Sequence, residues 1–481
     1  MAQPVLTYLT KEELEALHLA SMHILKNTGV VFPNKQALDI FQAGGATIDE
    51  PKSLVKIPAR MVEDALAKAP RELHLYARDP KHDIHITDLK KRWPIFSVLS
   101  GAMFILEGKN KVRRPATVND LANCNTIIDA CENFDFTDPP IAPQEVPLEL
   151  TWHHAYNTMF KTFTKPVNFE VEDLETTQDV IRMAIAVAGG EEAFRKRPLL
   201  SCVVLTVSPL TNDPEAISAV IEGTKYNLTI RASASGTMAG ATSPVTLAGC
   251  LAQSTAESLA WLVLIQLANP GNPFILGMNP RIVDMRYGTT CLSSPEWAIM
   301  RACLGDIGRY YNLPVGAMQM AVPSKVLDAQ AGFEKTLTGL MSALGGVTVL
   351  NGCIMDSQNQ TCLADLVFSN EVIGGLRRIL RGFEVNDEGL AIDVINEIGP
   401  AGNFLGHSHT RKHYREHWYP MLLERRSWSE WYNDGAKDLW DRAAEKAEEI
   451  LAHHCVPPLP EETCRELDDI VKVAEKRLLK R

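Results

Sequence analysis

Short apolar runs alternate with longer amphipathic segments along most of the chain, and the clearest such unit lies near the middle. Leu313 to Met318 is a short apolar run typical of a buried parallel strand, and Val347 to Leu350 is a second. Between them, apolar residues recur at the helical period at Phe333, Leu337, Leu340, Met341 and Leu344. Asp328 is suited to cap this helix, and Gly345-Gly346 is suited to end it. The pattern predicts a strand, a helix and a strand in a right-handed parallel crossover.

The same alternation of strand and helix signals recurs along the chain from Thr117. The strand candidates are Phe134 to Thr137, Pro166 to Glu170, Leu199 to Val207, Thr229 to Ser233, Pro273 to Gly277, Leu313 to Met318, Val347 to Leu350 and Ala364 to Phe368. Eight strands with helices between them predict an α/β fold, a TIM-type (β/α)8 barrel. An open doubly wound sheet fits such evenly spaced units less well.

The rest of the pattern divides the chain into three parts. Residues 1–115 read as an N-terminal helical extension with a β-hairpin, in which Phe96 to Leu106 and Lys111 to Arg114 flank Gly108-Lys109-Asn110. Residues 116–400 form the predicted barrel, and residues 401–481 a C-terminal helical extension that covers barrel helices.

Composition and charge narrow the class of protein. The 481 residues carry a formal net charge of −11, which disfavours a nucleic-acid partner because such proteins present a basic face. No uninterrupted apolar run is long enough for a membrane span, and the acidic start shows no signal-peptide pattern. The ten cysteines form no CxxC pair, which argues against a zinc ribbon. We therefore expect a protein of the reducing cytoplasm, without membrane contact.

The placement of the histidines excludes several kinds of catalytic site. Thirteen histidines are present, but none lies between residues 155 and 406, where most of the strands are predicted. Catalytic zinc usually draws on several histidines, and Ser-His or Cys-His dyads need one. We therefore expect no metal ligands and no histidine-based nucleophile in the barrel, and no catalytic residue is assigned.

One histidine cluster lies after the predicted barrel. His409, His413 and His417 are spaced to share one helical face, and Glu416 is close enough to join them. A metal or partner site is one interpretation, and a polar helix face with ion pairs is the other. Arg411 and the neighbouring basic residues would repel a cation, which favours the polar face.

Residues near the carboxyl ends of the predicted strands, most of them polar, are the candidates for substrate binding, because barrel active sites form there. They are Asn168, Glu170, Gln319, Lys325, Asn351 and Met355. Lys325 has three interpretations: a Schiff-base lysine, a partner of a substrate carboxylate, or a solvated loop residue. Met278, Met318, Met320 and Met355 fill the core or, alternatively, face a cofactor.

Several segments, in the same order, resemble the trimethylamine methyltransferase (MttB-type) superfamily. They include Leu9-Thr10 through His18, Thr28-Gly29-Val30, Ala43 to Ala46, Ile57-Pro58, Asp328-x-Gln330-Ala331-Gly332-x-Glu334-Lys335, Glu397 to Gly402, His409-Thr410 through Arg415, and Trp418-Tyr419-Pro420. The resemblance covers nearly the whole chain. It implies a TIM-type barrel that moves a methyl group from an amine to the cobalt of a separate corrinoid protein.

The founding trimethylamine enzymes of this superfamily carry pyrrolysine in the barrel, and this chain contains none. It therefore resembles the non-pyrrolysine branch, whose members demethylate quaternary amines such as glycine betaine, proline betaine and carnitine. The segment Asp83 to Asp88 lacks the glycine of the DxHxxG cobalamin motif, so the corrinoid is expected on a partner protein.

The resemblance and the residues together give one leading functional hypothesis. The expected activity is transfer of a methyl group from a quaternary amine, glycine betaine first, to Co(I) of a cognate corrinoid protein at the barrel mouth. Gln319, Lys325 and Asn351 are the candidate donors to a betaine carboxylate. The alternatives are a Schiff-base lyase that uses Lys325 and a non-catalytic betaine-binding barrel. A homo-oligomer without an intrinsic metal is also expected.

Overall fold

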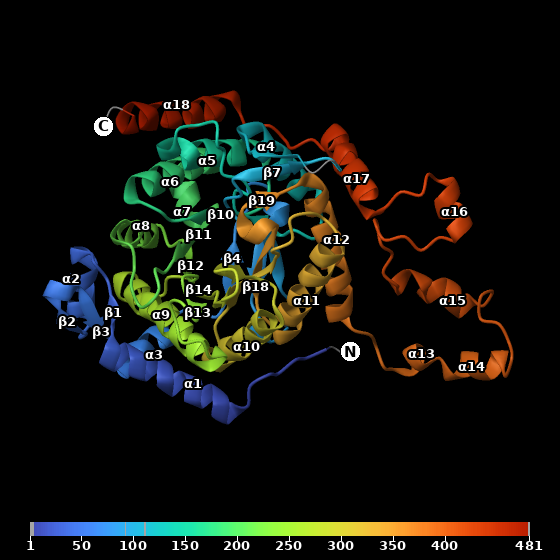
Figure 1. The fold of residues 1–481 in the computed structure, drawn as a ribbon, viewed down its shortest axis with the longest axis horizontal. Helices are drawn as coiled ribbons and strands as arrows, with labels where there is room; N and C mark the ends of the chain where they lie inside the picture. The colour runs from blue at the N-terminus through green and yellow to red at the C-terminus, as the bar shows by residue number, and fades with distance from the viewer. Residues whose placement is uncertain (1–3, 92, 110–111, 480–481) are drawn as a thin grey trace.

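The computed structural model describes residues 4–91, 93–109 and 112–479, and its centre is a closed barrel (Figure 1). Among these residues, eight parallel strands form the ring. In order around it they are β10 (Val167–Glu170), β11 (Leu200–Leu205), β12 (Thr229–Ala234), β14 (Phe274–Met278), β17 (Val315–Ala321), β18 (Val349–Ile354), β6 (Ile95–Val98) and β9 (Phe136–Thr137). The closed ring confirms the predicted TIM-type fold.

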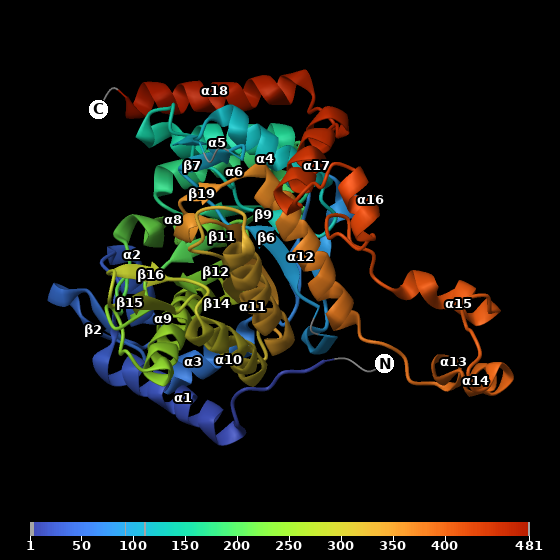
Figure 2. The same cartoon turned by 45° about the vertical axis from the view of Figure 1, so that its right-hand side comes forward.

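One long helix follows each barrel strand and packs on the outside of the ring, as Figures 1 and 2 show from two sides. These helices are α4 (Val118–Ala130), α5 (Thr151–Thr162), α6 (Leu174–Ala188), α8 (Pro214–Thr224), α9 (Leu247–Ala268), α10 (Pro295–Tyr311), α11 (Ala329–Gly345) and α12 (Leu363–Arg381). A short α7 (Glu191–Lys196) precedes β11.

The predicted crossover β17–α11–β18 is confirmed, with parallel pairing of its two strands. Asp328 caps α11 by accepting from the N–H groups of Gln330 and Ala331, and the helix ends at Gly346 with φ of 88°. The face of α11 that packs inward differs from the expected apolar stripe. Phe333 is 64% exposed, whereas Lys335 is fully buried.

Two element predictions were wrong. Ala364 to Phe368 is not a strand but the first turns of α12, whose apolar positions continue at the helical period to Leu380. A short apolar run fits either element, and here the longer period decides. The missing barrel strand is β6, at Ile95–Val98, inside the segment assigned to the N-terminal extension. Gly101, at φ of 86°, separates β6 from the next strand, so Phe96 to Leu106 is not one continuous strand.

The hairpin predicted after this point is present at the carboxyl ends of the barrel strands. β7 (Phe104–Glu107) pairs antiparallel with β8 (Val112–Pro115) and parallel with β19 (Gln360–Thr361). Asn110 and Lys111 of the predicted turn lie outside the described residues. A second small sheet at the same end contains β13 (Met238–Ala239), β15 (Arg281–Asp284) and β16 (Thr289–Cys291).

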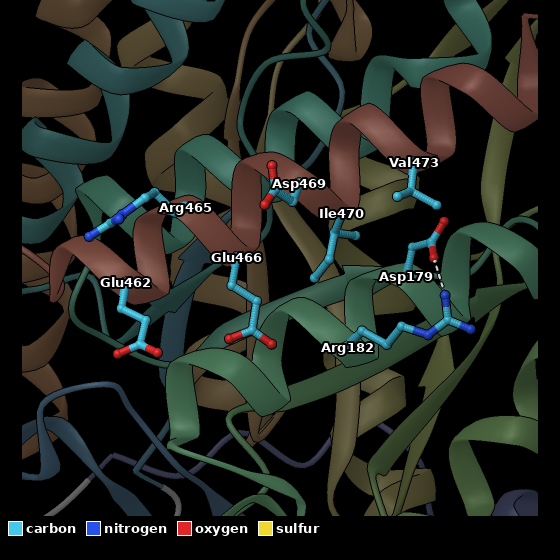
Figure 3. A pocket seen from close by; sticks show the side chains of 8 residues that line it. All are labelled: Asp179, Arg182, Glu462, Arg465, Glu466, Asp469, Ile470 and Val473. Carbon is cyan, nitrogen blue, oxygen red and sulfur yellow. Dashed lines mark hydrogen bonds and ion pairs between the residues drawn. The ribbon is translucent and has the colours of Figure 1, made fainter.

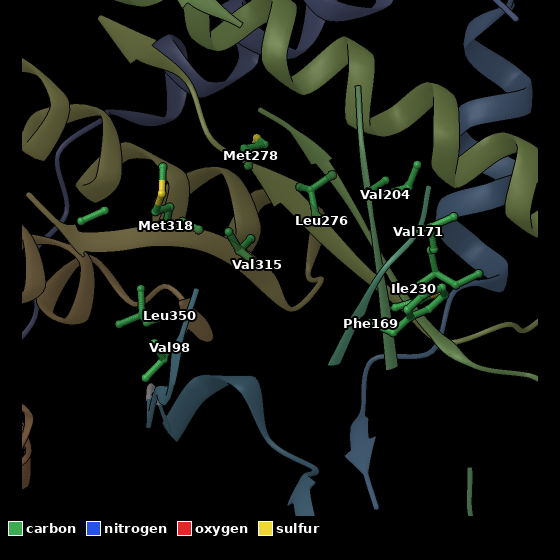
Figure 4. Close-up of a cluster of buried hydrophobic side chains, with 14 of the residues drawn as sticks. Val98, Phe169, Val171, Val204, Ile230, Leu276, Met278, Val315, Met318 and Leu350 are labelled. Atoms are coloured by element: carbon green, nitrogen blue, oxygen red, sulfur yellow. The ribbon is translucent and has the colours of Figure 1, made fainter. Parts of the chain in front are cut away.

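The main core lies between the strands and the helices. Side chains that point outward from the strands form one layer of it, including Val98, Ile230, Leu276 and Leu350 (Figure 4). Helix α9 is buried along most of its length. By length and composition it is the one described helix apolar enough to cross a membrane, but 89% of that window is buried inside the protein, as in a core helix.

The amino ends of the strands are closed by a small hairpin. β4 (Leu73–Leu75) pairs with β5 (Ile84–Ile86), and Leu73 and Leu75 pack against Ile95 and Ile275 of the barrel. This apolar cluster fills one end of the barrel. The opposite end, where the strands finish, is therefore the end that can hold a ligand.

The two ends of the chain lie on the outside of the barrel. The N-terminal part contains α1 (Lys11–His23), a π-helical turn (Ile24–Thr28), α2 (Lys35–Ala43), α3 (Ala59–Lys68) and a sheet of β1 (Val30–Val31), β2 (Thr47–Asp49) and β3 (Leu54–Lys56). A capping box of Thr10 and Glu13 starts α1. At the other end, α17 (Leu439–His453) packs on α4 and α12, and α18 (Glu461–Leu478) packs on α5 and α6.

Candidate active site at the barrel mouth

A cavity of about 330 Å³ opens at the carboxyl ends of the barrel strands. Its size is within the range of roughly 300–1,000 Å³ that is usual for small-molecule sites. It is lined by Leu99, Ser100, Gly101, Asp138, Trp152, Glu170, Val203, Leu205, Arg231, Ser233, Ser235, Asn279, Arg281, Met318, Asn351, Ser357, Gln358 and Asn359. Two cations, two carboxylates and one tryptophan thus face one space.

Arg231 extends from the middle of β12 into the barrel and is only 4% exposed. Alternation along β12 places Arg231, Ser233 and Ser235 on the inner side. Two glycines make room for it: a Cβ at Gly316 would lie 2.5 Å from Arg231 Cδ, and one at Gly277 would lie 2.9 Å from its Cγ. Gly277 on β14 and Gly316 on β17 thus leave the space through which the arginine stem passes.

The Arg231 guanidinium has few partners inside the protein. In the amide orientation that satisfies both of its polar atoms, the Asn351 side-chain oxygen accepts from Arg231 Nη2 at 3.0 Å, and its nitrogen donates to the Ala317 carbonyl at 3.2 Å. Burial lowers the pKa of Arg231, and the nearby carboxylates of Asp138 and Glu170 oppose that shift. At neutral pH it remains a cation.

Asp138 directly follows β9 and is 1% exposed. Burial raises its pKa to about 6, although Arg231 and a hydrogen bond from Asn168 Nδ2 act in the opposite direction. The Asn168 carbonyl oxygen in turn accepts from Ser201 Oγ at 2.8 Å. Asn168 therefore lies behind Asp138 and orients it, and it does not line the cavity.

Glu170 ends β10 and supplies the second carboxylate. Its side chain accepts a hydrogen bond from Ser100 Oγ, and its backbone N–H donates to the Tyr156 hydroxyl at 3.2 Å. Trp152, from the first turn of α5, lines the cavity on the same side as Gly101, since a Cβ there would lie 3.8 Å from the indole. A carboxylate and an aromatic face together are suited to hold an ammonium group.

Arg281 on β15 is the second cation of the cavity. Its guanidinium donates to the Gln358 side-chain oxygen at 3.1 and 3.2 Å, in the amide orientation that accepts both bonds. Burial lowers its pKa, and Glu170 opposes the shift. Among the described residues, no partner accepts from Nε of Arg231 or of Arg281, and none donates to Asp138 Oδ2. Buried polar groups without partners are unusual and mark a place where a ligand supplies them.

The structure brings together only some of the residues predicted from the sequence. Glu170 and Asn351 line the cavity. Lys325 does not: it is 67% exposed and pairs with Asp356 at 2.7 Å. Gln319 is fully buried, and its amide nitrogen lies 3.9 Å from Cys353 Sγ. Met355 is buried but is not part of the lining, where Met318 is the methionine present.

The histidine cluster forms a polar surface rather than one helical face. Helix α15 (Ser408–His413) ends before His417, and the His409 and His413 rings lie 4.4 Å apart. His413 contacts Glu416 at 2.6 Å and Glu388 at 3.2 Å. Across the described residues, no group of three or more His, Cys, Asp or Glu side chains could hold a metal ion.

A second depression, of about 620 Å³, lies between α6 and α18 (Figure 3). Its charged residues are on the protein surface or already paired: Asp179 binds Arg182 at 2.9 Å and His153 at 3.1 Å. This depression is not located at the carboxyl ends of the barrel strands. The smaller cavity at the barrel mouth is therefore the candidate active site.

The sequence analysis missed Asp138, Trp152, Arg231 and Arg281. Two of them had a signal in the sequence. Asp138 follows a predicted strand directly, as catalytic carboxylates in barrels do, and Arg231 is a lone charge within an otherwise uncharged strand, Thr229–Ala234. Arg281 lies on β15, in a connection outside the barrel whose path no local pattern predicts.

Comparisons with known proteins identify the family of this chain. The family model described as trimethylamine methyltransferase (MTTB) matches residues 1–478. The trimethylamine methyltransferase MttB of Desulfitobacterium hafniense is 37% identical over 465 residues, which is 96% of this chain and 93% of that protein. The trimethylamine methyltransferase MttB2 of Methanosarcina mazei is 31% identical over 486 residues, 98% of this chain and 96% of that protein.

A glycine betaine methyltransferase of Desulfitobacterium hafniense is 29% identical over 463 residues, 95% of each chain. Among solved structures, the monomethylamine methyltransferase of Methanosarcina barkeri matches with a TM-score of 0.48 and 12% identity, over 96% of this chain and 92% of that chain. The family model and relatives above 30% identity each cover nearly the whole length. The chain is therefore a methyltransferase that belongs to the trimethylamine methyltransferase (MTTB) family.

Proposed function

We propose that this methyltransferase demethylates a betaine, a quaternary amine that also carries a carboxylate, and passes the methyl group to the cobalt of a corrinoid protein. The observation that supports the substrate is the pair of arginines, Arg231 and Arg281, with unpartnered Nε atoms in the cavity. Two guanidinium groups and two carboxylates sum to zero charge. A zwitterion matches this sum, and a lone ammonium ion does not.

The arrangement gives each end of such a substrate its own partners. The substrate carboxylate is held by Arg231 and Arg281, because charge-assisted hydrogen bonds between guanidinium and carboxylate are strong and directional. The ammonium group lies toward Glu170 and Trp152, where a carboxylate and an aromatic face attract it. The methyl group to be transferred then points to the open end of the cavity.

The chemistry needs little from the protein beyond position. The carbon–nitrogen bond breaks with its electron pair left on nitrogen, and the methyl group goes to the reduced cobalt of the corrinoid, which is the second substrate. The tertiary amine leaves neutral, so no general acid is required, in keeping with a cavity that contains no histidine. Since positive charge is lost in the transition state, the two arginines favour the reaction by disfavouring the ammonium charge.

The rim of the cavity is suited to receive the flat face of a corrinoid. Leu205 lines the cavity and is 37% exposed, and Val207, just beyond it, is 50% exposed. Met285 and Tyr287, in the loop between β15 and β16, are exposed by 65% and 75%. Exposed apolar residues around an active-site opening are typical of a docking surface.

The test uses the purified chain with cob(I)alamin under reducing conditions and measures formation of methylcobalamin from its absorption spectrum. Glycine betaine, proline betaine, carnitine and trimethylamine are compared as donors. We expect turnover with at least one betaine and little with trimethylamine. Turnover with trimethylamine alone would overturn the proposed substrate class.

Arg281→Met tests the carboxylate partner. We expect it to raise KM for the betaine about tenfold or more, because one charge-assisted hydrogen-bonding group is worth roughly 1.5–3 kcal/mol. Arg286→Met is the matched control. Arg286 lies just after β15, its side chain is 80% exposed, and it binds Asp284. Equal effects of the two substitutions would contradict the assignment of Arg281.

A further inference from the structure

A segment near the C-terminus, residues 383–436, stands away from the barrel in both views (Figures 1 and 2). We call this segment the arm. It contains α13 (Asp387–Leu390), α14 (Ile392–Ile398), α15 and α16 (Trp428–Asn433), joined by irregular stretches. It leaves the barrel after α12 and returns to it at α17.

Most of the arm is uncovered by its own chain, apart from residues 418–423, which contact α12. Of its residues, all of which the structure describes, only Leu422 is buried. Its exposed large apolar side chains are Phe383, Val385, Leu390, Ile392, Ile395, Phe404, Leu405, Tyr414, Tyr419, Met421, Leu423, Trp428 and Tyr432. Apolar surface concentrated in this way on one segment marks a surface that another molecule covers.

The arm nevertheless has a definite internal structure. Asn386 caps α13, and a capping box of Ser427 and Glu430 starts α16. Glu388 of α13 is bound by Lys412 and His413 of α15, so the two short helices are tied together. Isolated helices of four to seven residues are unstable in water, so these contacts alone leave the arm in need of a partner.

The same chain carries an apolar groove of about 840 Å³ on the barrel surface. It runs along α11 and α12 and is bordered by α17 and the base of the arm. Its lining is Leu327, Asp328, Ala329, Gly332, Thr336, Phe368, Glu371, Val372, Gly375, Leu376, Arg378, Ile379, Trp418, Leu423, Asp438, Leu439 and Trp440. The charged residues of this lining are Asp328, Glu371 and Asp438 against Arg378, so the groove is acidic.

The charges of the arm are divided between its two parts. Residues 383–399 contain Glu384, Asp387, Glu388, Asp393 and Glu397 and no Lys or Arg. Residues 405–426 contain Arg411, Lys412, Arg415, Arg425 and Arg426 against Glu416 and Glu424. The basic part of an arm, residues 405–426, therefore complements the acidic groove in charge.

We propose that the arm of one chain docks in this groove on a second copy of the same chain. Because every copy carries both an arm and a groove, a two-fold arrangement makes the contact twice and closes on itself. The apolar side chains of the arm then cover the groove, and the basic part of the arm lies beside the acidic residues of the groove. This inference does not depend on the proposed substrate.

The test measures molar mass in solution by light scattering after size-exclusion chromatography. The chain has a mass of 53.2 kDa, and we expect the wild type to run as two chains or a multiple of two. The arm variant Ile392→Asp/Ile395→Asp and the groove variant Ile379→Asp should each run as one chain. The control, Leu19→Asp/Val473→Asp, changes exposed apolar residues on α1 and α18 and should keep the wild-type mass.

Mixing provides the sharper test of the pairing. The arm variant retains its groove and the groove variant retains its arm, so an equimolar mixture forms one intact contact and part of the two-chain species returns. A cooperative thermal unfolding transition in each variant shows that the barrel has folded, since Ile379, Ile392 and Ile395 are exposed and lie outside its core. A wild type that runs as one chain, or an oligomer that the arm variant leaves intact, would overturn the proposal.

A further outcome identifies a different occupant. If the wild type is a single chain and the arm variant turns over free cob(I)alamin normally but fails with the corrinoid protein, the arm serves that partner. The proposed pairing of two copies would then be wrong.

Discussion

Substitution of Gly316 by alanine is expected to reduce activity through Arg231, without changing any group that touches the substrate. Gly316 lies on β17, and its neighbour across the barrel is the stem of Arg231. An added Cβ would lie 2.5 Å from Arg231 Cδ and 3.1 Å from Ile275 Cγ2. The Arg231 stem also passes close to Gly277 on β14, so it cannot move away from a new methyl group without carrying the guanidinium with it.

The size of the effect follows from those distances. Carbon atoms pack at about 3.5–4.0 Å, so the Arg231 stem must shift by about 1 Å. Overpacking of this kind costs roughly 1–3 kcal/mol of stability. A guanidinium displaced by that distance loses the geometry of a charge-assisted hydrogen bond worth roughly 1.5–3 kcal/mol, so kcat/KM for a betaine should fall about tenfold to a hundredfold.

The assay is methylcobalamin formation over a range of betaine concentrations, with thermal unfolding as a measure of stability. Gly223→Ala is the matched control, since its Cβ would meet its nearest neighbours, Leu228 and Cys202, at 3.7 and 3.8 Å. It should leave kcat/KM unchanged. A folded Gly316→Ala protein with wild-type kcat/KM for every betaine would refute the assignment of Arg231.

Three further predictions concern charged groups. Burial raises the pKa of Asp138 to about 6, so the wild-type protein loses stability as the pH rises from about 4 to 6. Asp138→Asn has no such proton to lose. The difference in unfolding free energy, variant minus wild type, should therefore grow by about 3 kcal/mol over that interval and stay constant at higher pH. Lys335→Met leaves Asp365 buried without its partner at 3.0 Å and should cost about 3–5 kcal/mol in denaturant unfolding, most of it recovered by adding Asp365→Leu. Lys325→Ala should not change methyl transfer, because the exposed lysine pairs with Asp356; loss of activity, or borohydride trapping on Lys325, would favour the lyase.

The sequence predicted the barrel well because its signal is repeated eight times. An error in one unit, such as the strand assigned to Ala364 to Phe368, does not affect the others. Local ambiguity explains both misplaced strands. Strand β6 has only four residues, and no turn signal follows it in the sequence until Gly101 turns the chain. Apolar periodicity shows where an element lies, but it does not show which of two short apolar runs enters the barrel.

Helix α11 shows a second limit of the pattern. Its apolar stripe predicted the packed face, yet Phe333 is exposed and Lys335 is fully buried. The inward side is instead formed by small and polar residues, because Lys335 Nζ binds Asp365 and Ser369 of α12. Such a buried ion pair between two neighbouring helices cannot be deduced from one helix alone.

The candidate site was predicted less completely than the fold, since it depends on side chains from distant parts of the chain. Glu170 and Asn351 belong to strands that the sequence located, and both line the cavity. Lys325 was placed near the right strand but in a loop that turns away, where Asp356 binds it. Arg281 reaches the cavity from a small sheet outside the barrel, and no residue pattern indicates that path.

The ionisation of Asp138 connects the architecture of the barrel with the choice of substrate. With Asp138 ionised, the two arginines are balanced by two carboxylates, and a zwitterion enters without adding net charge. With Asp138 protonated, the cavity holds an excess positive charge that disfavours any cation without a carboxylate of its own. Since burial places this pKa at about 6, the charges of the cavity are balanced at neutral pH, and both arginines stay charged to bind the carboxylate of the proposed substrate. If the proposed substrate is correct, Gly277 and Gly316, which admit the Arg231 stem, affect specificity without touching the substrate.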